Sequence, residues 1–178
     1  MSEPLRARRS EIAPEPPRDE RSAPPAGSPS MRWHGFLVRA MLYLAAAFHA
    51  LQAWRILSGG IYFDAQVRAA VYAALPGMRA LDALLAATQI AGAALQIAAR
   101  FELRALRARG AGLLKAAYLT LLGGAAAYAL GRLWISALSP LSAPLIGQIG
   151  AYLGLMLVNS AYYRRRRAAL TGAKGEKE

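Results

Sequence analysis

The chain contains no cysteine. It therefore forms no disulfide of its own, offers no thiolate to a metal and has no cysteine nucleophile. Acidic residues are also scarce away from the two ends, because only Asp64, Asp82 and Glu102 lie between residues 31 and 175. None of the three falls at the centre of an apolar run, where a proton-coupled transporter generally has a carboxylate. A small multidrug antiporter is therefore not expected.

Histidine is rare as well. His34 and His49 belong to the same apolar segment and would lie ~22 Å apart along a helix. They could not ligate one haem iron within a monomer. The sequence also lacks a Ser-His-Asp set, a His-Glu-x-x-His motif and a glycine-rich phosphate loop. We predict no catalytic residue, no metal site and no cofactor, and we expect that the protein is not an enzyme.

Long apolar runs dominate what is present. Hydrophobic residues make up 56% of the 178 residues, and the mean hydropathy is +0.24. Four runs approach the ~20 residues that a helix needs to cross a bilayer. They cover about residues 35–57, 81–99, 113–135 and 145–163. The predicted fold class is all-α, an integral membrane bundle of four transmembrane helices with a disordered N-terminal tail.

The two ends differ from the apolar middle in composition. Residues 1–30 are rich in proline, arginine, glutamate and serine, and such a segment has too little apolar surface to offset its ordering entropy. We predict a disordered cytoplasmic tail there, a transmembrane domain over 31–167 and a polar C-terminal tail over 168–178. If translation began at Met31, the first run would instead resemble a signal peptide. The helical pattern continues past Ala50 without a turn-like break, which argues against cleavage.

Basic residues gather beside particular ends of the runs, and this pattern predicts orientation. Positively charged connections remain on the cytoplasmic side, where they also meet anionic lipid headgroups. The residues concerned are Arg100, Arg104, Arg107, Arg109, Lys115, Arg164, Arg165, Arg166 and Arg167. We therefore expect a multi-pass protein of a bacterial inner membrane with both termini cytoplasmic and anionic lipids as partners. Nucleic acid is not an expected partner despite a pI near 10.9, because the charges bracket apolar spans instead of forming one basic face.

A shorter amphipathic segment lies between the first two spans. Residues 61–75 place Phe63, Val67, Val71 and Leu75 in one i,i+4 row, with Asp64 and Arg68 on another face. This pattern is typical of a helix that lies on the membrane surface, with an ion pair between the two charged residues. A buried re-entrant segment is the alternative.

Polar side chains inside the runs suggest a seam. His49, Gln52, Gln89 and Gln96 are its candidate members. Such groups commonly make hydrogen bonds between helices, which is the interpretation we favour. The alternative is a small transporter or channel that uses them as its polar path.

Small residues predict where helices approach closely. The candidate packing residues are Gly147, Gly150, Gly154, Gly123 and Gly124. The GxxxG spacing of Gly150 and Gly154 allows a neighbouring backbone to come near. We expect the neighbour to be a span of the same chain. A homo-oligomer or another membrane protein is the alternative partner.

The chain resembles a family of four-span bacterial inner-membrane proteins of unknown function. The resemblance covers the layout of residues 35–167 and is carried by 100–104 (RFELR), 112–118 (GLLKAAY) and 159–166 (NSAYYRRR). It implies the four-span fold but no activity, ligand or catalytic residue. The leading hypothesis is a non-enzymatic membrane protein that acts through helix packing or through contact with partners or lipids.

Overall fold

The computed structural model describes residues 31–62, 64–136, 143–167 and 170. Within these residues the secondary structure is helical and contains no strand. Four helices are long and apolar enough to cross a membrane, namely Arg32–Leu57, Gly77–Arg104, Arg109–Ser136 and Pro144–Arg165. The predicted all-α, four-span fold is confirmed. The predicted N-terminal tail lies outside the described residues.

The first spanning helix is not uniform. It comprises α1 (Arg32–Phe36), a wider π-helical turn η2 (Leu37–Met41) and α2 (Leu42–Leu57). Single π turns inside α-helices are frequently found at functional sites. After α2 the chain reverses at Gly59, whose φ of 81° lies in the left-handed region that favours glycine.

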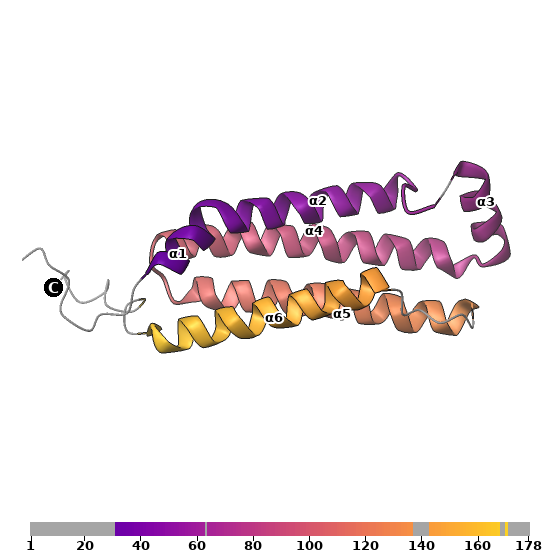
Figure 1. The fold of residues 1–178 in the computed structure, drawn as a ribbon. Coiled ribbons are helices and arrows are strands. Elements are labelled where there is room, and N and C mark those ends of the chain that lie inside the picture. The colour runs from indigo at the N-terminus through magenta and orange to yellow at the C-terminus, as the bar shows by residue number, and fades with distance from the viewer. Residues whose placement is uncertain (1–30, 63, 137–142, 168–169, 171–178) are drawn as a thin grey trace, which may run out of the picture. The chain divides into compact units, whose positions relative to one another are not determined.

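The other helices complete an up-and-down arrangement (Figure 1). They are α3 (Ala65–Ala74), α4 (Gly77–Arg104), α5 (Arg109–Ser136) and α6 (Ala143–Arg165). Packing follows chain order, with α2 on α4, α4 on α5 and α5 on α6. We call the end that contains α1, the α4–α5 turn and the end of α6 the basic end. The opposite end carries α3.

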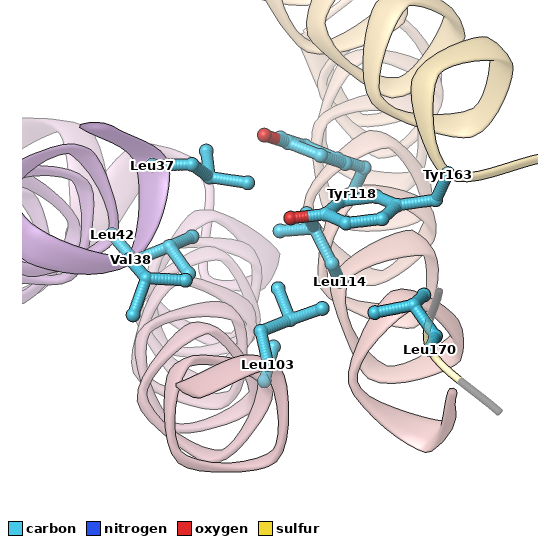
Figure 2. Packing of buried hydrophobic residues seen from close by; sticks show 9 residues of the cluster. Leu37, Val38, Leu42, Leu103, Leu114, Tyr118, Tyr163 and Leu170 are labelled. Atoms are coloured by element: carbon cyan, nitrogen blue, oxygen red, sulfur yellow. The ribbon is translucent and has the colours of Figure 1, made fainter. Parts of the chain in front are cut away.

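The hydrophobic core has one large cluster, at the basic end. Leu37, Val38 and Leu42 meet Leu103 of α4, while α5, α6 and Leu170 supply the rest (Figure 2). Leu170 belongs to the segment predicted as a polar tail, yet only 5% of its surface is exposed. Burial of its apolar side chain explains why it packs here. The rest of residues 168–178 lies outside the described residues.

Close approach of helices occurs between α4 and α5. A Cβ added to Gly124 would collide with Thr88, and one added to Gly92 would stand 2.6 Å from Leu121 Cδ2. The side chain of Leu81 lies equally close to Gly131. Gly124, one of the predicted packing residues, thus lies against α4 in the described bundle.

The other predicted packing glycines have no such contact. A Cβ on Gly123, Gly147, Gly150 or Gly154 would meet no other atom of the described residues within 4 Å. The expectation that they pack within the chain therefore stays a prediction. Helix α6 contacts α5 through other residues, so its glycine face is left uncovered by the described part of this chain.

Helix α3 begins at Asp64, which caps it by accepting a hydrogen bond from the Val67 N–H at 2.7 Å. The expected ion pair with Arg68 does not form, because Arg68 donates to the Ser58 carbonyl at 2.7 Å. An N-cap carboxylate is already stabilised by the backbone donors of the first turn. Val67, Val71 and Leu75 share the face of the segment that lines a cavity of the bundle. Phe63 lies outside the described residues.

Candidate functional site

The structure brings two of the four predicted seam residues together. His49 of α2 and Gln89 of α4 are both buried, and the His49 Nδ1 lies 2.7 Å from the Gln89 Oε1. Because an amide oxygen only accepts, this nitrogen is the donor. Tyr152 of α6 extends the contact, with its hydroxyl 3.4 Å from the same nitrogen, and it accepts a bond of 2.6 Å from Gln148. The result is a hydrogen-bonded link across three helices.

Gln52 and Gln96 do not belong to this link. The Gln52 Oε1 accepts a bond of 3.4 Å from Arg55 on the exposed side of α2. Gln96 is buried, and its Oε1 has no hydrogen-bond partner among the described residues. The cavities of about 410, 460 and 480 Å³ in the described bundle are lined by other residues and do not include the seam candidates. The predicted seam is therefore a local contact in the described bundle.

Sequence reasoning missed Tyr152. It lies one helical turn after Gln148, and residues four apart share a helix face. That spacing was the available signal.

A second set of polar contacts lies at the basic end. Trp33 donates its indole N–H to the Asn159 Oδ1 at 3.0 Å, and the Asn159 Nδ2 donates to the Tyr118 hydroxyl at 3.1 Å. The His34 Nδ1 lies 3.1 Å from the Tyr163 hydroxyl. These bonds join α1 to α5 and α6, so they hold the start of the first spanning helix in place.

A basic cavity of about 480 Å³ lies beside these polar contacts, and His34 belongs to both. We use the name basic cavity for the space lined by His34, Gly35, Val38, Arg39, Arg100 and Arg104. No carboxylate of the described residues lines it. The nearest acid in sequence, Glu102, instead pairs with Arg107 at 3.6 Å. Three guanidinium groups thus share one space without an internal counter-charge.

Arg100 is the fixed member of the cavity. Its surface is 8% exposed, and its Nε donates to the Val38 carbonyl of η2 at 3.1 Å. The guanidinium lies 3.9 Å from the centroid of the Tyr43 ring, a cation–π distance. Its Nη1 is buried and has no hydrogen-bond partner among the described residues. A buried donor without a partner is costly, so this nitrogen is available to an acceptor from outside the described residues.

The remaining predicted headgroup residues lie at the same end. Lys115, Arg164 and Arg167 line a separate cavity of about 410 Å³ between α5 and α6. The guanidinium of Arg166 lies 3.9 Å from the Tyr162 ring centroid. Arg107 lies in the turn between α4 and α5, Arg109 is the first residue of α5, and Arg165 is the last residue of α6. The charges predicted to face headgroups therefore gather at one end of the bundle.

Comparison of the chain with family models, with curated proteins and with solved structures finds no match. The four apolar helices mark it as a multi-pass membrane protein.

Proposed function

We propose that this protein binds the phosphate of an anionic lipid headgroup in the basic cavity, and that it acts by binding and not by catalysis. The single observation that carries the proposal is Arg100, whose buried Nη1 has no partner among the described residues. Guanidinium groups match the geometry of phosphate and are its preferred ligands in buried settings.

The surroundings of Arg100 favour a headgroup over a free ion. Arg39 and Arg104 are exposed and line the same cavity, at the end of helices that are long enough to span a bilayer. A phosphate at this depth is that of a lipid whose chains lie beside the bundle. The Val38 carbonyl and the Tyr43 ring fix the guanidinium plane, so little ordering is needed on binding.

The proposal includes orientation. The basic end lies on the cytoplasmic side of a bacterial inner membrane, since basic residues near span ends are retained on that side and anionic lipids attract them. The transporter alternative rests on His49 and is tested separately below.

The experiment compares lipids retained by the purified protein. Nanodiscs of equal parts phosphatidylglycerol and phosphatidylcholine are extracted with mild detergent, and bound lipid is counted by native mass spectrometry. We expect retention of phosphatidylglycerol to fall about tenfold for Arg100→Gln, as for loss of one charged hydrogen bond. Arg104→Gln should lower it too, and because this side chain is exposed the fold should be unaffected.

The matched control is Arg165→Gln. It removes the same charge at the same end of the bundle, but Arg165 does not line the basic cavity. Equal phosphatidylglycerol retention by Arg104→Gln and the parent would refute the proposal.

A further inference from the structure

A buried carboxylate lies at the end of the bundle opposite the basic cavity. Asp82, near the start of α4, is 3% exposed. Its Oδ2 accepts two hydrogen bonds, from the Tyr62 hydroxyl at 2.6 Å and from the Tyr72 hydroxyl at 2.8 Å. Two tyrosines from the α3 region thus converge on one oxygen of one acid.

The other carboxylate oxygen has no partner within hydrogen-bonding distance among the described residues, although Tyr128 interacts with the carboxyl group as a whole. The Asp82 Oδ1 is buried and makes no hydrogen bond within the described residues, and no arginine or lysine there forms an ion pair with Asp82. An ionised carboxylate out of water is costly unless it is paired. A cation with N–H donors would satisfy the free oxygen, and the described residues supply no such cation.

A cavity of about 460 Å³ lies beside this part of α4, and residues that contact or flank Asp82 line it although Asp82 itself does not. Met78 and Leu85 line it and lie four residues before and three residues after Asp82, on the same face of α4. Tyr62 lines it as well, so its ring separates the cavity from the acid to which it donates. Tyr128 of α5 is a further lining residue and interacts electrostatically with Asp82. Negative charge thus lies behind two phenol rings on one side of the cavity.

The opposite sign of charge is present too. Arg132, one helical turn after Tyr128 on α5, lines the same cavity. A ligand that matches both walls carries a cation and an anion a few bonds apart. The remaining lining is mainly apolar and includes Val67, Val71 and Leu75 of the α3 segment.

We propose that this cavity binds the phosphoethanolamine headgroup of a phospholipid, with the ammonium toward Asp82 and Tyr62 and the phosphate toward Arg132. A primary ammonium brings three N–H donors for the free carboxylate oxygen, whereas a trimethylammonium brings none. The apolar α3 row suits the beginning of the acyl chains. Helix α3 packs against α4 and buries none of its own residues, so it can shift to admit the ammonium to Oδ1. The proposal does not depend on the basic cavity, because it rests on different residues at the other end.

The test uses the full chain in nanodiscs that contain equal amounts of phosphatidylethanolamine, phosphatidylcholine and phosphatidylglycerol. After detergent extraction, native mass spectrometry counts each retained lipid. We expect the parent to retain about tenfold more ethanolamine lipid than choline lipid, as for one charge-assisted hydrogen bond gained. Asp82→Asn, which keeps the side-chain shape and an acceptor for the tyrosines, should abolish this preference. Arg132→Gln should lower retention of both zwitterionic lipids.

Arg79→Gln is the matched control, because Arg79 lies on the same turn of α4, is exposed and does not line the cavity. It should leave the preference unchanged. Thermal unfolding of each variant identifies any that fails to fold, and Tyr62→Phe then serves in place of Asp82→Asn. An equal preference in parent and folded Asp82→Asn protein would overturn the proposal. Displacement by free phosphoethanolamine without any retained lipid would overturn the assignment to a lipid.

Discussion

The indole N–H of Trp33 donates to the amide oxygen of Asn159, so that the start of the first spanning helix is bonded to the last at 3.0 Å. The helices otherwise pack in chain order from α2 to α6. Polar side chains therefore connect the first spanning helix to α6, which do not pack on each other in chain order. They do so at Trp33 and again where the Tyr152 hydroxyl approaches His49.

Asn159→Leu should loosen α6. The change removes the bonds to Trp33 and to Tyr118, and interhelical hydrogen bonds in membranes contribute ~0.6 kcal/mol each. We expect a loss of about 1 kcal/mol in unfolding measured in mild detergent. Ser160→Ala, at the exposed neighbouring position, is the control. A parent-like melting curve for Asn159→Leu would show that α6 is held without these bonds.

Two leucine substitutions separate the glycine faces. Gly124→Leu should destabilise the bundle by 2 kcal/mol or more, roughly the cost of overpacking, because even a Cβ there collides with Thr88. Gly150→Leu should leave the free energy of unfolding unchanged within about 0.5 kcal/mol, since nothing in the described residues lies near it. Chemical or thermal unfolding of both variants in one detergent decides. A larger loss for Gly150→Leu would mean that its face packs on a second chain.

Alkaline pH should weaken the attachment of α3. Burial, followed by the hydrogen bond to Asp82, raises the pKa of both Tyr62 and Tyr72 above the ordinary value near 10. Nearby Arg68 opposes this rise in the pKa of Tyr72. A raised pKa in the folded state gives stability that is complete below pH ~10 and is lost as pH rises through the folded values. The slope of the unfolding free energy above pH ~10 should be shallower for the double variant Tyr62→Phe and Tyr72→Phe, with proteolysis at residues 58–64 as a local readout. Identical slopes would contradict the shared role of the two hydroxyls.

Reporter fusions test the proposed orientation. A reporter placed after Arg109 or after Lys174 should report cytoplasm, whereas one placed within residues 136–143 should report the exterior, because basic residues near span ends dominate orientation. Neutralising Arg104, Arg107 and Arg109 together with Lys115 should produce mixed orientation. Neutralising Arg68 and Arg79 at the other end should not. A cytoplasmic signal from the fusion within 136–143 would reverse the proposed topology.

Flux measurements address the transporter alternative. Proteoliposomes that contain the parent should show no more ion or proton flux than those that contain His49→Ala, because His49 is engaged with Gln89 and does not line any of the three cavities described above. Flux in the parent that disappears in the variant would establish the alternative and count against a binding role.

The spans were predictable because hydropathy and helix length are local properties of the sequence. The partner of each polar residue was not. Asp82 reads from the sequence as a charge at a span end, and only the fold of α3 brings Tyr62 and Tyr72 to it. The spacing of small residues likewise shows which helix faces lack bulky side chains, but it does not identify the helix that packs against them. Gly124 and Gly150 thus look alike in the sequence, whereas only Gly124 meets a neighbouring helix within the described residues.

The basic cavity was likewise predictable only in part from the sequence. Two of its arginines, Arg100 and Arg104, were expected at headgroup level from their position beside spans, and both line the cavity. The contact between Arg100 and the Val38 carbonyl depends on the π turn. Nothing in the periodicity of residues 37–41 indicates such a turn, although Arg39 interrupts the apolar run at this point.

The π turn also sets the rotational phase of the first spanning helix. A residue added to or removed from a helix turns everything before it by about 100°. Trp33 and His34 contact α6, and the five residues of η2 lie between them and α2. Deleting one residue from this turn would tend to regularise the helix locally. It would also rotate both anchors away from Asn159 and Tyr163 and carry Val38 away from Arg100. The number of residues between Trp33 and His49 is thus as much a determinant of this end of the bundle as their identities.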